Sequence, residues 1–280
     1  MDYKMIVIDM DGTLLDEQST VSENVKDYIK ELRKQGKLVF IATGRTLREA
    51  KGVLQSDFEL DGIVTANGMA VFVKDEPLSQ YALPPQLVEE LVEKAEARGI
   101  FYEVHPNEGS RFALNQDKAL LLSQISDPKP ETVEENEWIS RKREIDEIVW
   151  VDQLETNSIA KIYFFSKSKE SIIKWKEEFE KMKRNIDFNY FSSSVHNVEV
   201  TVSNISKATG VQTLLDKFHL SKEDVMAIGD SENDLPLFEF AAYSVAMKNA
   251  PEIVKERANE ITDFSYDEDG LYKYLKKTFS

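Results

Sequence analysis

Cysteine is absent from all 280 residues of this sequence. Disulfide bonds, cysteine-bound metals and thiol catalysis are therefore excluded. Long apolar runs are missing as well, because no segment approaches the roughly 18 residues that a membrane-spanning helix needs. Charged residues at Asp2, Lys4, Asp9 and Asp11 interrupt the N-terminal segment. We therefore expect no signal peptide and a cytoplasmic location.

Positive charge is scarce. The chain has 35 Lys and Arg residues against 51 Asp and Glu, a formal net charge of −16. An acidic surface repels nucleic-acid phosphates and anionic membranes, so we expect neither as a partner. Hydrophobic residues make up 41% and charged residues 31%, which is ordinary for a globular enzyme. The length allows one large domain or two modest ones.

The first part of the chain alternates between strand and helix patterns. Apolar runs occur in "MIVIDMDGTLLDE", "KLVFIATGR" and "DGIVTANG". Between them, Ser22 can cap a helix that ends at Gly36, and Thr46 with Glu49 forms a capping-box pattern that opens another helix. Buried strands that alternate with helices predict an α/β, doubly wound (Rossmann-like) parallel sheet.

The middle of the chain has a different pattern. One helical pattern runs from Pro84 to Ala97 and a second lies in "SKESIIKWKEEFEKM", where Trp175 and Phe179 are expected core residues. Alternating segments such as "FYEVH" and "SIAKIYFF" predict strands of an antiparallel sheet with helices on one side. After these, an apolar run in "VMAIGD" and helices near 232–241, 251–257 and 268–278 resume the first pattern. We expect a core of residues 1–82 and 190–280, interrupted by an α+β cap domain of residues 83–189.

Polar residues follow three of the predicted core strands. They are Asp9 and Asp11, Thr43 with Gly44, and Asp230. Parallel sheets bind ligands at the carboxyl ends of their strands, so these residues should meet in one crevice. Lys207 begins a helix whose apolar stripe starts at Val211, which places the lysine on the face toward the sheet.

This set of groups suits phosphoryl transfer. Carboxylate oxygens are ligands that Mg²⁺ prefers, and the ion would offset the repulsion between Asp9 and Asp11. The hydroxyl of Thr43, the amide of Gly44 and the Lys207 ammonium could hold phosphoryl oxygens. One carboxylate could then act as the nucleophile and another as the acid and base.

Simpler structural interpretations compete with these roles. The two aspartates could belong to a simple turn, and Ser231 with Asp234 has the spacing of a capping box, which can coexist with a functional role. His105 and Arg111 could contact substrate, but a surface or half-buried strand position is the better interpretation for His105.

Four short motifs, in order, resemble those of the haloacid dehalogenase-like (HAD) phosphatases. They are "DMDGT", "TGR", the lysine of "SK" and "GDSEND". The long interval between the second and third motifs, and a closing pattern at Ala258, Asn259, Thr262 and Asp269-Gly270, resemble the Cof-type subfamily. One departure is Ala208, where the family usually has glycine; we expect it to affect only the shape of the site.

The resemblance implies a role for each matching residue. Asp9 would be the nucleophile and Asp11 the general acid and base. Phosphate would be bound by Met10, Thr43, Gly44, Lys207 and Asn233. The metal would be held by Asp9, Asp11 (through its backbone carbonyl), Asp230 and Ser231. Supporting positions would be Asp234, Asn67, which would face the substrate, and Arg45.

The resemblance also implies an activity. We expect a Mg²⁺-dependent phosphatase that forms an aspartyl-phosphate and acts on a small phosphorylated metabolite. Family members act on sugar phosphates, pyridoxal phosphate, FMN or ribityl-pyrimidine phosphates. A phosphosugar mutase and a catalytically idle phospholigand-binding regulator are the alternatives, while dehalogenation would leave Asp11 and the metal without a role. A monomer and a homodimer are both compatible with the sequence.

Overall fold

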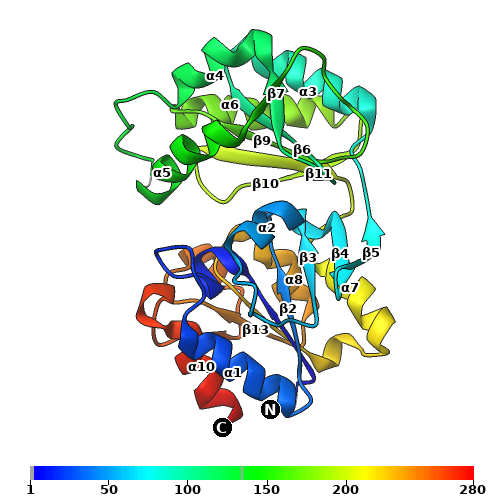
Figure 1. Ribbon diagram of the computed structural model, residues 1–280, viewed down its shortest axis with the longest axis vertical. Coiled ribbons are helices and arrows are strands. Elements are labelled where there is room, and N and C mark those ends of the chain that lie inside the picture. The colour runs from blue at the N-terminus through cyan, green and yellow to red at the C-terminus, as the bar shows by residue number, and fades with distance from the viewer. Residues whose placement is uncertain (1–2, 134) are drawn as a thin grey trace. The chain divides into compact units, whose positions relative to one another are not determined.

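The computed structural model describes residues 3–133 and 135–280. The chain divides into two compact units. The core unit comprises the residues up to Gln80 together with Ile205–Ser280, and the inserted unit comprises Tyr81–Asn204. Figure 1 shows that each unit contains both strands and helices.

The core unit is built on one eight-stranded sheet. Its strands are β1 (Met5–Ile8), β2 (Leu38–Ala42), β3 (Gly62–Thr65), β4 (Ala70–Val73), β5 (Glu76–Gln80), β12 (Val225–Gly229), β13 (Tyr243–Ala246) and β14 (Glu260–Ile261). The order across the sheet is β14-β13-β12-β1-β2-β3-β4-β5. All neighbours from β14 to β3 are parallel, and β4 and β5 are added as antiparallel strands at one edge.

Helices cover both faces of this sheet. They are α1 (Glu23–Lys34), α2 (Leu47–Val53), α7 (Lys207–Phe218), α8 (Leu235–Phe240), α9 (Glu252–Lys255) and α10 (Gly270–Phe279). Ile6 and Ile8 of β1 belong to the same buried cluster as residues of α1 and α10, whereas Met5 and Val7 belong to the cluster that includes α7 and α8. Because successive strand residues point to opposite faces, both faces of β1 are buried. The predicted doubly wound α/β core is therefore confirmed.

The helix signals in the sequence act as predicted. The Ser22 hydroxyl accepts a hydrogen bond from the Val25 N–H at 3.3 Å and caps α1. At α2, Thr46 and Glu49 form the reciprocal capping box. Each contact satisfies backbone N–H groups that the first turn of a helix leaves without partners.

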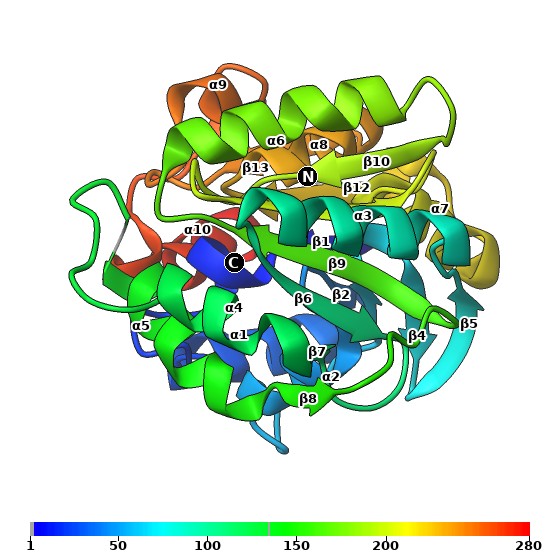
Figure 2. The same cartoon turned by 90° about the horizontal axis from the view of Figure 1, so that it is seen from above.

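The inserted unit contains a six-stranded sheet. Its strands are β6 (Phe101–Pro106), β7 (Phe112–Leu114), β8 (Val149–Val151), β9 (Ile159–Phe165), β10 (Phe188–Phe191) and β11 (Asn197–Val202), in the order β10-β11-β9-β6-β7-β8. Figure 2 shows β6 and β9 side by side, and their pairing is antiparallel. β7 and β8 are the one parallel pair in this sheet within the described residues.

Helices pack on both faces of the inserted sheet. Its helices are α3 (Pro85–Arg98), α4 (Lys118–Gln124), α5 (Glu135–Glu144) and α6 (Lys169–Met182). Trp175 and Phe179 of α6 pack on Phe164 of β9, as expected for core residues. Trp138 of α5 instead packs on Phe165, the next residue along β9 and therefore on the opposite face. The prediction that helices lie on only one side of this sheet is therefore wrong, because α5 packs on the opposite face from α6.

We expected the inserted unit to begin after residue 82 and to end at residue 189. In the structure it begins at Tyr81 and ends at Asn204. The reason is strand pairing: β10 pairs with β11, and β11 pairs with β9 in the middle of the inserted sheet. The alternating pattern of β11 predicts a strand but does not show which sheet the strand joins. Its hydrogen-bond partners are β9 and β10 of the inserted unit.

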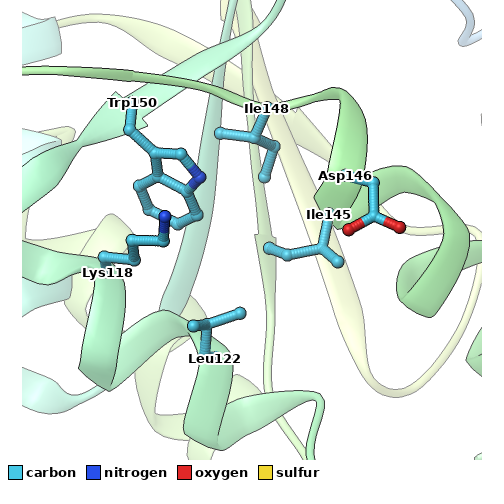
Figure 3. A pocket seen from close by; sticks show the side chains of 6 residues that line it. All are labelled: Lys118, Leu122, Ile145, Asp146, Ile148 and Trp150. Carbon is cyan, nitrogen blue, oxygen red and sulfur yellow. The ribbon is translucent and has the colours of Figure 1, made fainter.

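A pocket of about 420 Å³ lies within the inserted unit (Figure 3). Lys118, Leu122, Ile145, Asp146, Ile148 and Trp150 line it. The Lys118 ammonium lies 5.0 Å from the centre of the Trp150 ring, so this cation already has an aromatic partner in the pocket. None of the predicted site residues contributes to the lining. Elsewhere, no helix in the described part of the chain combines the length and apolar character that spanning a membrane requires.

Candidate active site

The site lies where the connections of the core sheet change direction. Strands β1, β2 and β3 follow one another toward one edge, and β12, β13 and β14 toward the other. β1 and β12 are therefore neighbours whose following loops lead away on opposite sides. Such a switch point opens a crevice at the carboxyl ends of the strands. Asp9 follows β1 and Asp230 follows β12, so the topology alone brings them together.

Three carboxylates meet a buried lysine at this switch point. Asp9, Asp230 and Asp234 each place an oxygen within 4.8 Å of the others. The Lys207 ammonium donates to Asp9 Oδ1 at 2.5 Å and to Asp234 Oδ1 at 2.7 Å, and the lysine side chain is fully buried. The predicted position of Lys207, on the sheet side of the first turn of α7, is confirmed.

The electrostatics of this cluster indicate that positive charge is lacking. Burial, with repulsion from Asp234 and Asp11, raises the pKa of Asp9 to about 7 although Lys207 opposes the shift. Burial and the neighbouring Asp9 also raise the pKa of Asp230 well above its ordinary value. Burial would lower the pKa of Lys207, but Asp234 and Asp9 outweigh it and raise that pKa. When all three carboxylates are ionised, the one ammonium leaves two negative charges uncompensated, so oxygen ligands and charge both fit one divalent cation.

Asp234 is held by backbone groups as well as by Lys207. Its Oδ2 accepts hydrogen bonds from the N–H groups of Asp230 at 3.0 Å and Ser231 at 3.1 Å. The Ser231 contact belongs to the capping box predicted from the spacing of Ser231 and Asp234. A Cβ at Gly229 would lie 2.4 Å from Asp234 Cγ, so this carboxylate can occupy its position only beside a glycine. Asp234 therefore fixes the loop that presents Asp230.

Asp11 lies beside the cluster and pairs with Arg45. The Arg45 Nε donates to Asp11 Oδ2 at 2.8 Å, and its second nitrogen donates to Oδ1 at 2.7 Å. This two-point contact fixes the plane of the carboxylate. The Asp11 side chain is 56% exposed, whereas Asp9 is buried. The first and second motifs are therefore joined directly through Arg45.

Polar contacts connect the ends of β2, β3 and β12. The Thr43 hydroxyl accepts the Arg45 N–H at 3.1 Å, and the Thr43 carbonyl accepts the Asn67 N–H at 2.9 Å. The Asn67 Oδ1 accepts from Asn233 Nδ2 at 3.1 Å, and the Ser231 hydroxyl donates to Asn233 Oδ1 at 2.7 Å. These contacts bring Thr43, Asn67, Ser231 and Asn233 into one network. The adjoining Gly44 is half-buried in the same loop.

Gly68 allows α7 to begin next to β3. Its φ is +103°, and a Cβ there would lie 2.1 Å from the Ser206 carbonyl oxygen. The residue after Ser206 is Lys207, so this close approach brings the lysine to the carboxylates. Asn-Gly pairs favour turns, and Asn67-Gly68 also has a packing function at the site.

The backbone after Asp9 turns tightly. Gly12 has φ +74°, and the Met10 carbonyl accepts the Leu15 N–H at 2.9 Å. The Met10 side chain is buried in the core cluster beneath the site. This anchor holds the backbone next to Asp9 in place, and the role expected for the Met10 amide stays a prediction.

Sequence reasoning missed two polar residues that contact the Asp230 carboxylate. The Thr13 hydroxyl donates to Asp230 Oδ1 at 3.1 Å, and Asn249 Nδ2 lies 3.3 Å from Asp230 Oδ2. Thr13 is the last residue of the motif "DMDGT", so the sequence alone could have indicated that it lies at the site. Asn249 follows β13 in a stretch without a recognised motif, and only the neighbouring positions of β12 and β13 could have indicated it.

The closing pattern supports the fold around the site. Asn259 Oδ1 accepts the Ser244 N–H at 2.8 Å, and Asp269 accepts the Ser22 hydroxyl at 2.8 Å. The Thr262 hydroxyl accepts the Lys248 N–H at 2.9 Å. These residues connect β13, α1 and the loop after β13 to the C-terminal segment.

In the inserted unit, His105 and Arg111 are buried around Glu103. His105 Nε2 lies 3.2 Å from Glu103 Oε2, and one Arg111 nitrogen donates to the same oxygen at 3.1 Å. The expected surface or half-buried position of His105 is therefore wrong: the residue is 2% exposed. A charged partner on the same strand face makes its burial possible, and alternation alone does not reveal that partner.

Comparison with known proteins gives a consistent result. Residues 6–275 match the family model described as haloacid dehalogenase-like hydrolase. The phosphatase YitU of Bacillus subtilis, named for 5-amino-6-(5-phospho-D-ribitylamino)uracil, is 29% identical over 282 residues, covering 99% of this chain and 97% of its own. YcsE of the same organism has the same activity in its name and is 28% identical over 276 residues, covering 99% and 96%.

Solved structures agree on the fold. A haloacid dehalogenase-like hydrolase from B. subtilis superimposes with a TM-score of 0.81 at 23% identity, covering 98% of this chain and 99% of its own. The match of the family model over residues 6–275 confirms the hydrolase class and the family predicted from the four motifs. The chain belongs to the haloacid dehalogenase-like hydrolases.

Proposed function

We propose that this protein is a Mg²⁺-dependent phosphatase of small phosphomonoesters that uses Asp9 as its nucleophile. The observation that carries the proposal is the Lys207 ammonium between Asp9 and Asp234, with Asp230 beside them. A lysine at this position can neutralise phosphoryl oxygens while the carboxylates hold a cation. The names of the matched relatives, which are phosphatases, support the same reaction class.

The acidic cluster is the proposed Mg²⁺ site. Asp9, the backbone carbonyl of Asp11, Asp230 and Ser231 (directly or through water) would hold the ion, and Asp234 would keep this set in place. When bound, the ion would neutralise the carboxylates and polarise a phosphoryl oxygen. The two uncompensated negative charges of the cluster support a divalent ion at this position.

The first half of the proposed reaction transfers the phosphoryl group to Asp9. A carboxylate oxygen of Asp9 forms a bond to phosphorus while the bond from phosphorus to the ester oxygen breaks. Asp11 donates a proton to the departing oxygen, which leaves as an alcohol. The Thr43 hydroxyl, the Lys207 ammonium and the Asn233 side chain, with the amides of Met10 and Gly44, would bind the phosphoryl oxygens.

The second half returns the enzyme to its starting state. Asp11, now a carboxylate, accepts a proton from a water molecule whose oxygen attacks phosphorus. The bond between phosphorus and Asp9 breaks, and inorganic phosphate leaves. Arg45, which donates to both oxygens of Asp11, would limit the orientations of that carboxyl group during the reaction.

The proposed substrate class is a small phosphorylated metabolite. YitU and YcsE are named for a ribityl-pyrimidine phosphate, so that compound belongs in the first substrate panel together with sugar phosphates, pyridoxal phosphate and FMN. Both relatives are less than 30% identical to this chain. Measured kcat/KM values for phosphate release from each compound of the panel therefore identify the preferred phosphomonoester.

Asp9→Asn tests the nucleophile. We expect phosphate release with Mg²⁺ to fall about 10⁴-fold or more, because an amide is a poor nucleophile and removal of a nucleophile typically costs this much. Asp27→Asn, on the exposed surface of α1, is the matched control and should keep full activity. Equal phosphate release by Asp9→Asn and the unmodified protein would refute the assignment, and full activity after chelation would refute the metal requirement.

A further inference from the structure

We infer that Asn249 is a positioning residue that orients the Asp230 carboxylate for the divalent cation. The inference rests on the proposed function, because it takes Asp230 as a ligand of that ion. Asn249 carries no charge, so it can direct a carboxylate without competing with a cation. An ammonium at the same place would neutralise Asp230 and weaken the metal site.

The sheet brings Asn249 to Asp230. Strand β13 ends at Ala246, which pairs with Gly229 at the end of β12. The Met247 N–H then donates to the Gly229 carbonyl at 2.9 Å, which extends the pairing by one step. The loops after the two strands therefore run side by side. Asn249 and Asp230, which follow these strands, meet across the gap between the loops.

Three hydrogen bonds determine how the Asn249 amide is oriented. The Tyr266 N–H donates to Asn249 Oδ1 at 3.2 Å, which identifies the side of the amide that carries the oxygen. The nitrogen therefore faces the other way, where it donates to the Gly12 carbonyl at 2.9 Å. From that position it also reaches Asp230 Oδ2 at 3.3 Å. The amide thus joins the first motif, the fourth motif and the C-terminal segment.

The contacts to Asp230 leave room for a cation. One carboxylate oxygen accepts the Thr13 hydroxyl at 3.1 Å and the other accepts Asn249. Gly12 adds a steric limit, since a Cβ there would lie 2.3 Å from Asp230 Oδ2. Each carboxylate oxygen can accept two bonds, so one direction per oxygen stays available for the ion. Residues that fix ligands in this way commonly change metal affinity by about 10-fold to 100-fold when removed.

A purely structural role is the competing explanation. Asn249 also ties the loop after β13 to Gly12 and Tyr266, so its removal could loosen the loop without a specific effect on the ion. The two explanations differ in what changes. Loosening lowers the thermal stability of the metal-free protein, whereas loss of positioning lowers the affinity for Mg²⁺ in a protein of unchanged stability.

The experiment measures Mg²⁺ binding by isothermal titration calorimetry on the full chain without substrate. For Asn249→Ala we expect the Kd for Mg²⁺ to rise about 10-fold. Lys248→Ala is the matched control, because this neighbouring side chain is exposed and pairs with exposed Glu268. Its Kd should stay within about twofold of the unmodified value. Melting temperatures in EDTA should agree among the three proteins within a few degrees.

Each outcome decides the inference. An Asn249→Ala protein that melts normally and binds Mg²⁺ as tightly as the unmodified protein overturns it, while the proposed metal site stands. Absence of Mg²⁺ binding by the unmodified protein overturns both proposals. If Asn249→Ala melts early, Asn249→Ser is measured instead, because it keeps a polar group in the loop but is too short to reach Asp230. Normal affinity in a stable Asn249→Ser protein would also contradict the inference.

Discussion

At the scale of single residues, the candidate site depends on charges that are held in fixed positions. Lys207 bridges Asp9 and Asp234, and Arg45 holds both oxygens of Asp11. The two basic residues differ in setting: Lys207 is fully buried, and Arg45 is 23% exposed. A buried ammonium suits a permanent partner for phosphoryl oxygens. A guanidinium at the edge suits the orientation of the solvent-exposed Asp11 carboxylate, which we propose as the acid and base.

The Arg45 contact predicts a specific kinetic defect. Arg45→Met should lower kcat by about 10-fold to 100-fold with little change in KM, because misplacement of an acid weakens proton transfer more than binding. The loss should be larger for an alkyl phosphate than for p-nitrophenyl phosphate, whose leaving group needs little protonation. Steady-state kinetics on the two substrates measures the difference.

Lys51→Met in α2, the helix that follows Arg45 in the chain, is the control, because the Lys51 side chain is exposed and pairs with exposed Asp75. It should leave kcat for both substrates unchanged. An equal loss on both substrates in Arg45→Met would show that Arg45 does not act through proton donation by Asp11.

At the scale of secondary-structure elements, Glu103 ties together the inserted unit. Burial alone would raise the pKa of Glu103, but Arg141, His105 and Arg111 together lower it to about 2. Arg141 belongs to α5 and Glu103 to β6, so the ion pair at 3.1 Å fixes α5 on its face of the sheet. The contribution of Glu103 to stability should be present above the ordinary glutamate pKa. It should be lost as the pH falls from that value toward 2.

Glu103→Gln should therefore destabilise the inserted unit. We expect a loss of about 3 kcal/mol in its free energy of unfolding, because the change removes the buried carboxylate that Arg141 and Arg111 both contact. The three tryptophans of the chain, Trp138, Trp150 and Trp175, all lie in the inserted unit, so tryptophan fluorescence during urea unfolding reports on it selectively. Exposed Glu108→Gln is the control. A transition in Glu103→Gln that coincides with the unmodified protein's would contradict the proposed contribution.

At the scale of the whole molecule, the sequence predicts what depends on local patterns and on strand order. The caps at Ser22 and Thr46 need only neighbouring residues, and they are found where expected. The proximity of Asp9 and Asp230 could be predicted, because ligands bind in a crevice at the carboxyl ends of parallel strands and both residues follow such strands. Lys207 could be oriented by its place one turn before an apolar helical stripe.

The features that were missed depend on contacts between distant segments. Asn249 and Gly12 lie 237 positions apart, and their hydrogen bond depends on which strand lies next to β12. The unit boundary moved because β11 pairs with β9, a choice that its own alternating pattern does not encode. The burial of His105 likewise depends on partners supplied by Glu103 and by the packing around it. Periodicity identifies the face of an element, but it does not identify what covers that face.

The central claim is the proposal that the clustered carboxylates of Asp9, Asp230 and Asp234 require a divalent cation. Because the pKa of Asp9 is raised to about 7, the metal-free cluster holds more protons than the unfolded chain between the ordinary aspartate pKa and about 7. Between these two pH values, the contribution of the cluster to the stability of the metal-free protein therefore decreases as the pH rises. Mg²⁺ must displace these protons, so its affinity should increase from pH 6 to pH 8.

Calorimetric titration of the protein with Mg²⁺ in buffers of different ionisation enthalpy tests this claim most directly. We predict one bound ion, release of protons near pH 7, and loss of binding in Asp230→Asn. Binding that releases no protons, or binding of equal strength in Asp230→Asn, would contradict the account.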